Sequence, residues 1–253
     1  MRNQKRFLIG LLIVVSFILA GCAGGDPALS APGVTLTLDP AGGPSQVNTG
    51  LQLLVLMTVL SVAPSILILA TSFTRIIIVM SLLRNAIGTP QIPPNQVVIG
   101  LSMLLTFFIM TPVYNKVNTE ALQPYLNQEI NQETALNKAM TPIRDFMFKQ
   151  TREKDLELFL SLSGEDRPKT LDDISTVVLM PAFVISELRT SFIMGFSVYI
   201  PFLIIDLVVS SILLSMGMMM LPPSLISLPF KILLFIMVDG WYLIAGSLAR
   251  SFL

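Results

Sequence analysis

Residues 191–221 read SFIMGFSVYIPFLIIDLVVSSILLSMGMMML, and Asp206 is the one charged residue among these 31. As a straight helix this stretch would be about 46 Å long, whereas the hydrocarbon core of a bilayer is about 30 Å thick. It is therefore too long for a simple straight span. Pro201 lies inside it, and Pro181, Pro222, Pro223 and Pro229 lie around it as potential helix breaks. The stretch predicts bent helices or hairpins packed on other protein.

The composition of the whole chain is that of a membrane protein. Of 253 residues, 53% are hydrophobic and 13% are charged, whereas about a quarter of the residues in a soluble domain are charged. The 16 basic residues balance the 16 acidic ones, so the net charge gives no indication of a nucleic-acid partner. We therefore expect an integral membrane protein that binds no nucleic acid.

The chain carries no recognisable catalytic or cofactor-binding signature. It has no histidine and a single cysteine, which excludes histidine-based catalysis, histidine metal sites and an internal disulfide. Phosphate-loop, nucleophile-elbow and metalloprotease motifs are absent from the sequence. We predict that the protein is not an enzyme and that it holds neither a cofactor nor a metal.

Residues 1–22 have the order of a signal peptide: basic residues, the apolar run Phe7–Ala20 and then small residues. Leu19-Ala-Gly-Cys22 also resembles a lipoprotein processing box, in which Cys22 would be lipidated. Ordinary cleavage between Ala20 and Ala31, or an uncleaved first helix, would explain the same residues. Residues 23–49 alternate proline with glycine and carry no lysine or arginine, which predicts an extended or disordered periplasmic linker.

The remainder divides into a first apolar block, residues 50–113, a polar segment, residues 114–175, and a second apolar block, residues 176–253. The polar segment holds 19 of the 32 charged residues. Arg75 and Arg84 follow the first long apolar run, and the positive-inside bias places them on the cytoplasmic side. Residues 114–175 would then be periplasmic, and the three- and four-residue spacing of their apolar side chains predicts amphipathic helices.

Several ionisable residues lie among apolar neighbours in the second block, and each is a candidate functional residue because charge is costly in a membrane. Glu187 and Lys231 have opposite signs, so we expect them to pair between helices or between neighbouring copies. That pair would fix the geometry of an assembly, whereas a proton or ion relay is the alternative. The other candidates are Arg189, Asp206 and Asp239.

The methionine loop, Met216-Gly-Met-Met-Met-Leu-Pro-Pro223, ends the long apolar stretch. Irregular backbone at membrane depth is tolerated only where it is buried in protein or lines a cavity. Methionine is flexible and polarizable, so several copies around an axis would form a deformable apolar seal that closes a pore. Ordinary packing in a core is the alternative for these methionines.

Phe146 and Phe159 lie on the apolar faces of the polar segment. They would pack in the small core of that segment, or they would form a contact between copies.

Five blocks together resemble the FliP family of the bacterial flagellar export gate, which is related to the corresponding injectisome proteins. The similarity covers nearly everything after Gly50. The blocks are Arg75-Ile-Ile-Ile-Val-Met-Ser-Leu-Leu-Arg84-Asn-Ala-Ile-Gly-Thr with Pro93-Pro-Asn-Gln96, Leu105-Thr-Phe-Phe-Ile-Met, Pro181-Ala-Phe-Val-Ile-Ser-Glu-Leu-Arg, Pro201-Phe-Leu-Ile-Ile-Asp and the methionine loop with its proline pair.

The resemblance implies an all-α integral membrane protein of bent helical hairpins with a small helical periplasmic domain, assembling into a helical, cone-like oligomer. It implies a homo-oligomer, a pentamer, with FliQ and FliR at the inner membrane in the flagellar basal body. FlhB and FlhA would be further partners, and unfolded flagellar subunits the cargo. Met218, Met219 and Met220 would form the pore gasket, Glu187 and Lys231 the subunit contacts, and Phe146 and Phe159 the periplasmic contact.

Three other functions remain open. The chain could be the corresponding injectisome subunit, or a secondary transporter with Asp206 and Asp239 as coupling carboxylates. It could also be a structural scaffold without a pore.

Overall fold

The computed structural model describes residues 28–31, 34–37, 44–164, 168, 170–218 and 221–252. The chain forms two compact units, residues 1–61 and 62–253. The predicted signal peptide, residues 1–22 with Cys22, lies outside the described residues.

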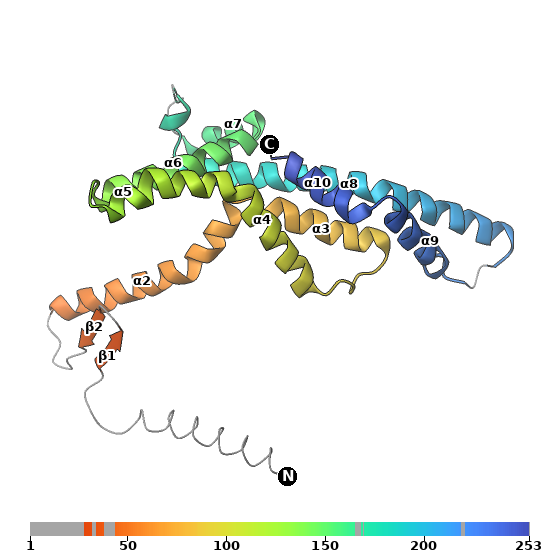
Figure 1. Ribbon diagram of the computed structural model, residues 1–253, viewed down its shortest axis with the longest axis horizontal. Coiled ribbons are helices and arrows are strands. Elements are labelled where there is room, and N and C mark those ends of the chain that lie inside the picture. Colours follow the sequence, from red (N-terminus) through yellow and green to blue (C-terminus); the bar gives the residue numbers. More distant parts are fainter. Residues whose placement is uncertain are drawn as a thin grey trace, which may run out of the picture. The chain divides into compact units, whose positions relative to one another are not determined.

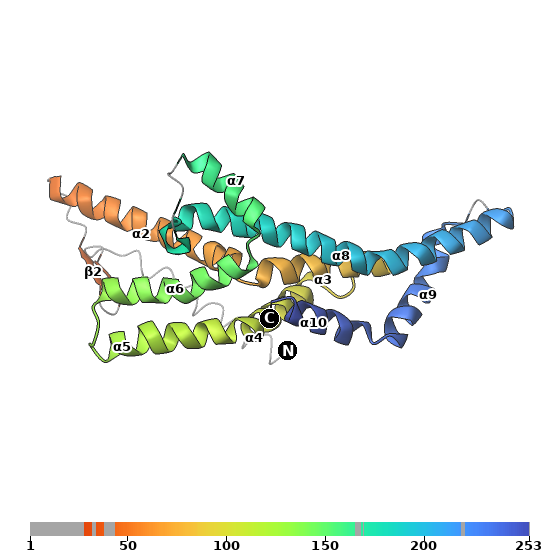
Figure 2. The same ribbon diagram turned by 90° about the horizontal axis from the view of Figure 1, so that it is seen from above.

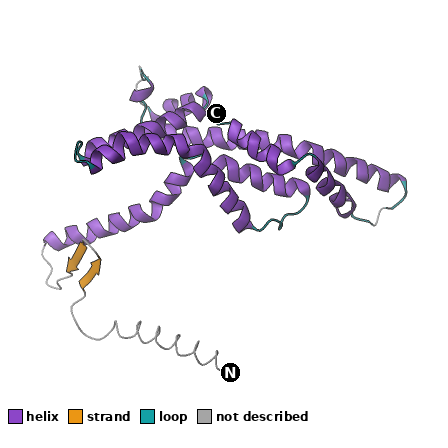
Figure 3. Cartoon of the chain, viewed as in Figure 1, coloured by secondary structure: helices purple, strands orange, loops and turns teal. Residues whose placement is uncertain are grey.

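The first unit contains the antiparallel hairpin of β1, Ala28–Ala31, and β2, Val34–Thr37 (Figure 3). Ala28 lies opposite Thr37. Helix α2, Pro44–Leu69, begins in this unit. The described part of residues 23–49 thus consists of this hairpin and the first residues of α2.

The second unit is helical, and Figure 1 shows the order of its elements. A turn at residues 70–72 separates α2 from α3, within the apolar run that the sequence shows as continuous. The elements are α3, Phe73–Ile87; α4, Asn95–Val117; the π-helix Asn118–Leu122; α5, Gln123–Leu126; α6, Gln132–Gln150; α7, Glu153–Ser163; the 3-10 turn Leu171–Asp173; α8, Thr176–Ser215; α9, Pro223–Met237; and α10, Gly240–Arg250.

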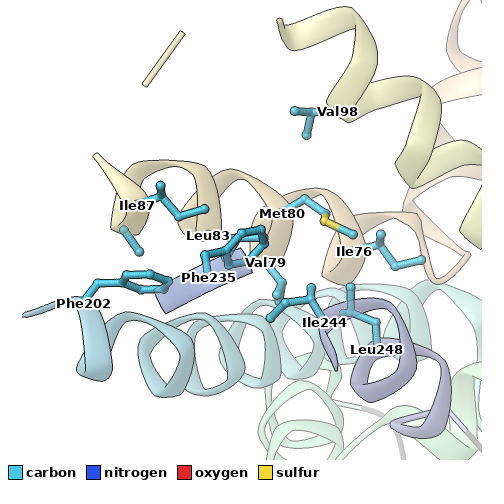
Figure 4. Packing of buried hydrophobic residues seen from close by; sticks show 11 residues of the cluster. Ile76, Val79, Met80, Leu83, Ile87, Val98, Phe202, Phe235, Ile244 and Leu248 are labelled. Atoms are coloured by element: carbon cyan, nitrogen blue, oxygen red, sulfur yellow. The ribbon is translucent and has the colours of Figure 1, made fainter. Parts of the chain in front are cut away.

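The apolar residues of α3 recur every three or four positions, so they lie on one face of the helix. This face packs mainly against α8. At the C-terminal end of α3, Gly88 takes the left-handed conformation, with φ 91°, which suits glycine because it lacks a Cβ. Figure 4 shows the cluster that α3 builds with α4, α8, α9 and α10. Its members are Ile76, Val79, Met80, Leu83, Ala86, Ile87, Val98, Phe202, Phe235, Ile244 and Leu248.

Helix α8 is one continuous helix of 40 residues and contains Pro181 and Pro201. The expectation that these two prolines break the chain is wrong. A proline removes one backbone hydrogen bond, but Phe183 and Phe202, close to the two prolines, are buried, so side-chain packing offsets that loss. The break falls at the methionine loop, after which α9 folds back against α8 (Figures 1 and 2). The predicted hairpin is therefore present, with its turn at this loop.

The polar segment is helical, as predicted, but it does not form a core of its own. Helix α4 continues through the π-helix into α5, past residue 113, and this extension packs against α6 (Figure 2). Helices α6 and α7 pack on the first half of α8. The core that they share with both apolar blocks contains Ala70, Met110, Phe146, Met147, Ile174, Val178, Leu179 and Phe183.

Two helices among the described residues are long and apolar enough to span a membrane, Asn95–Leu126 and Thr176–Ser215. Helices α9 and α10 would form a third span if the pair crosses together, although they are bent by 62°. At 1.5 Å per residue the two long helices measure about 48 and 60 Å, well beyond the hydrocarbon core of about 30 Å. The fold is that of an integral membrane protein whose longest helices exceed the thickness of a bilayer.

Candidate functional site

Arg75 and Glu187 form an ion pair in the interior of the second unit. Arg75 is 2% exposed and Glu187 is fully buried. The guanidinium Nε of Arg75 donates to Glu187 Oε2 at 2.9 Å, and Nη2 donates to Oε1 of the same carboxylate. The contact is bidentate, the geometry in which arginine and carboxylate match best.

The remaining donors of Arg75 bind two other parts of the chain. Nη1 donates to the backbone oxygen and to Oγ of Ser251, at 3.0 and 2.9 Å, and Nη2 donates to Gln150 Oε1 at 3.0 Å. The ring of Phe252 lies 3.9 Å from the Arg75 Cζ atom. All five N–H groups of the guanidinium are therefore used. One arginine joins α3, α6, α8 and the segment that follows α10.

A second ion pair joins α8 to α9. Lys231 is 5% exposed, and its Nζ donates to Asp206 Oδ2 at 2.6 Å and to the backbone oxygen of Ala86 at 3.2 Å. Ser227 donates from Oγ to the other oxygen of the Asp206 carboxylate, also at 2.6 Å. Because Ala86 lies in the last turn of α3, Lys231 supplies the positive charge that a helix C-terminus favours.

Within the chain, Glu187 and Lys231 do not pair with each other. Lys231 lies beside Asp206, 19 positions beyond Glu187 on α8, which is about 28 Å along the helix axis. Each of the two residues has another partner within the chain and is buried there. The partner of Glu187 within the chain, Arg75, is also set among apolar residues in the sequence, where the positive-inside bias assigns it a side of the membrane but no partner.

A third polar cluster joins α7, which lies outside the two long apolar helices, to Ser186 of α8. Arg152 donates to the Asp155 carboxylate from Nε at 2.8 Å and from Nη2 at 2.7 Å, and Ser186 Oγ donates to Asp155 at 2.6 Å. Hydrogen bonds from Arg152 lower the pKa of the Asp155 carboxyl, against the opposing effect of burial. The sequence showed these charges only as the polar face of an amphipathic helix and gave no sign of the contact with Ser186.

The other predicted charges lie differently from what we expected. Arg189 and Asp239 are exposed in this chain, not buried, and Asp206 is partly exposed. Asp239 lies at the bend between α9 and α10 with φ 50°, a left-handed conformation that aspartate tolerates better than most residues. These three residues have apolar neighbours in the sequence and yet are not buried, because the chain leaves one face of each apolar helix uncovered.

The methionine loop connects α8 to α9. Gly217 has φ 72°, and the N–H of Met218 donates to the Leu213 oxygen at 3.0 Å, a contact that closes the C-terminal end of α8. Pro223 then begins α9, at a position where a missing N–H costs nothing. Met216 and Met218 are exposed, at 66% and 39%. Met219 and Met220 lie outside the described residues.

Phe146 belongs to the core that α6 shares with α8, and Phe159 packs against it. Phe146 is 8% exposed, lies edge to face with Phe183 at 6.0 Å between ring centroids and stacks on Phe252 at the same distance. Phe159 is half-buried against the same cluster. Packing within the chain, one of the two predicted roles, accounts for Phe146 in this structure.

Comparison with known proteins gives a consistent result over most of the chain. Residues 56–248 match the model of the FliP family. The chain is similar to flagellar biosynthetic protein FliP of Bacillus subtilis, with 56% identity over 209 residues, covering 83% of this chain and 95% of the relative. The corresponding protein of Pectobacterium carotovorum is 50% identical over 253 residues, covering 100% of this chain and 94% of the relative. That of Aquifex aeolicus is 53% identical over 212 residues, with 83% and 89% covered.

Proposed function

This chain belongs to the FliP family, and we propose that it is a pore-forming subunit of the flagellar protein export gate. In this role several copies enclose a gated channel through which unfolded flagellar subunits leave the cytoplasm. The chain is a non-enzymatic component of the flagellar export apparatus, so other components would supply the energy for transport.

The observation that carries the proposal is the α8–α9 hairpin with the methionine loop at its turn. Its two helices keep large apolar side chains uncovered along their length, and so large an apolar surface indicates contact with lipid or with other protein chains. A helix of about 60 Å cannot bury all of this surface in about 30 Å of hydrocarbon, so part of it must be covered by protein. The uncovered side chains include Phe192, Phe196, Ile204, Leu207, Phe230, Leu233, Ile236 and Met237.

In the proposed assembly, copies of this chain, five in our expectation, and the partner chains FliQ and FliR cover that surface. FlhB and FlhA would complete the apparatus at the inner membrane, with residues 114–175 on the periplasmic side. The relatives carry flagellar names, which favours the flagellar over the injectisome system.

Met218, Met219 and Met220 would then meet around the axis and close the channel. The thioether side chain is unbranched and re-packs readily, and an apolar ring excludes water and ions when it is closed. The three polar clusters would hold the hairpin on the body of each subunit while the loop changes its packing. No coupling carboxylate is needed, and Asp206, which a transporter would require, is held by Lys231 and Ser227.

The proposal is tested by the conductance of the purified complex in planar bilayers. We expect the triple variant Met218→Ala, Met219→Ala and Met220→Ala to pass ions continuously, since three long apolar side chains per copy are lost from the closure. The matched control replaces two exposed methionines outside the methionine loop and the α8–α9 hairpin, Met57 and Met103, and should leave the complex closed. An equally tight triple variant would refute the gasket and favour a scaffold without a pore.

A further inference from the structure

A small pocket lies where the segment between α3 and α4 meets the first turns of α4. Its volume is about 220 Å³, and its walls are almost entirely apolar. Met80, Val97, Val98, Leu101 and Trp241 line it, and the one charged residue in its lining is Arg84. None of these residues belongs to the methionine loop or to the three polar clusters, so the pocket is independent of the proposed gate.

Arg84 has donors left over in this pocket. Its Nη1 binds the backbone oxygen of Pro93 at 3.2 Å and Asn95 Oδ1 at 2.6 Å. Its Nε is buried without a hydrogen-bond partner, and within the described part of the chain no acidic residue pairs with this arginine. A buried N–H without a partner is costly, and the Nε and Nη2 donors of a guanidinium form a parallel fork that suits phosphate or carboxylate. Because Nε is shielded from solvent, an anion would reach Arg84 first at Nη2, and a bidentate contact would follow from a small shift of the side chain that exposes Nε.

The surroundings favour an anion that carries an apolar tail. Helix α4 is one of the two candidate spans, and its first turn lies at this pocket. The wall residue Val97 is 53% exposed, and from there an uncovered apolar face continues along α4 to Leu104 and Phe108, which are 68% and 71% exposed. Trp241 is 45% exposed, and tryptophan is enriched at the level of lipid headgroups.

We propose that this pocket binds the phosphate of an anionic phospholipid, with Arg84 as the chelating residue and the acyl chains along α4. Arginine-lined pockets between helices on the cytoplasmic side are suited to such headgroups, and that is the side on which the positive-inside bias places Arg84. The bound lipid supplies the anion that the chain itself does not, and it fixes the segment between α3 and α4 against the bilayer surface.

The test uses the full chain purified in non-ionic detergent, stripped of lipid and titrated with phosphatidylglycerol, with phosphatidylcholine as the uncharged reference. Native mass spectrometry counts the retained lipids. We expect one phosphatidylglycerol per chain to be held at least about tenfold more tightly than phosphatidylcholine, as a bidentate charge-assisted contact would provide. Arg84→Gln should abolish this preference, and Arg84→Lys should restore part of it.

Two further variants separate the pocket from general electrostatics and from misfolding. Val97→Phe fills the rim of the pocket without touching Arg84 and should lower the retention of phosphatidylglycerol to a similar extent. Arg250→Gln removes an exposed charge and should leave retention unchanged. Equal retention by Arg84→Gln and the wild-type chain would overturn the proposal.

Two other outcomes would also overturn it, each in favour of a different ligand. If the chain retains inorganic phosphate as tightly as phosphatidylglycerol, the pocket is a simple anion site. Normal lipid retention in Arg84→Gln and Val97→Phe, combined with failure of both variants to assemble with partner chains, would assign the pocket to an acidic side chain of a partner.

Discussion

Replacing Arg75 should destabilise the protein more than replacing any exposed basic residue. The substitution Arg75→Met keeps a long, flexible side chain of similar reach but removes the guanidinium. Glu187, fully buried, then loses both hydrogen bonds of its bidentate contact. Gln150 and Ser251 each lose a donor as well.

The size of the effect follows from burial. Removing one partner of a buried ion pair typically costs about 3–5 kcal/mol, because the other charge is left without compensation. Replacing both charges with apolar side chains is far less costly and can be neutral, although each unsatisfied neutral group still costs about 1–3 kcal/mol. We therefore expect the double variant Arg75→Met, Glu187→Leu to lose clearly less than the sum of the two single losses.

The free energy of unfolding can be measured in mixed micelles by titration with a denaturing detergent. Trp241 is the single tryptophan of the chain and packs edge to face on Phe235 at 5.4 Å, so its fluorescence reports on the core of the same unit. Arg250→Met, at an exposed position, is the control and should stay within about 0.5 kcal/mol of the wild-type chain. A loss below about 1 kcal/mol for Arg75→Met, or strict additivity in the double variant, would refute the reasoning.

Two further predictions concern the contacts of α8. The pKa of Asp155 is lowered in the folded chain, so its carboxylate stabilises the fold above the unfolded-state pKa of about 3.9, and this stability is lost as the pH falls further. The free energy of unfolding, measured from pH 6 downward, should therefore fall less with pH for Asp155→Asn than for the wild-type chain. Parallel curves of unfolding free energy against pH would contradict the role of the Arg152 contact. A Cβ added to Gly195 would lie 2.3 Å from Leu82 Cδ1 and 3.1 Å from Leu82 Cβ. A Cβ added to Gly100 would meet no neighbouring side chain within 4 Å. Gly195→Ala should therefore cost about 1–3 kcal/mol and Gly100→Ala nothing, and equal thermal stability of the two variants would show that α3 and α8 can separate.

Local pattern was enough to predict the helical class and the turn at the methionine loop. Gly217 and the pair Pro222-Pro223 end one helix and begin another through backbone geometry alone, which is visible in the sequence. Pro201 does not break α8, because the cost of a proline within a helix is set by tertiary packing, in this case around the buried Phe202. Propensity identifies the weak point in a helix, but the neighbouring helices decide whether the chain breaks there.

The partners of the buried charges could not be predicted for a different reason. An ionisable residue in an apolar stretch needs a partner, and this much follows from electrostatics. Which partner it meets depends on the relative position of helices that lie far apart in the sequence. Glu187 is 112 positions from Arg75, and its partner within the chain is not Lys231, because the local sequence does not indicate which residue of another helix lies at the same level along α8.

The three polar clusters all contact α8 in its first 31 residues, at Ser186, Glu187 and Asp206. Each cluster ties the helix to a different element, namely α7, α3 and α9. Beyond Asp206, the hydroxyl groups of Ser211 and Ser215 donate only to backbone oxygens of α8 itself. The described residues between Leu207 and Met218 therefore lack a polar anchor to another element.

This uneven anchoring has a consequence for gating. Segments with few buried contacts open at a lower free energy than the cores to which they are attached. The tip of the α8–α9 hairpin, where Leu214 and Met216 are 58% and 66% exposed, can therefore change its packing while the ion pairs at Glu187 and Asp206 stay closed. We expect a gate built from this loop to open without unfolding the subunit, because the strongest contacts of α8 lie on the N-terminal side of the part that has to move.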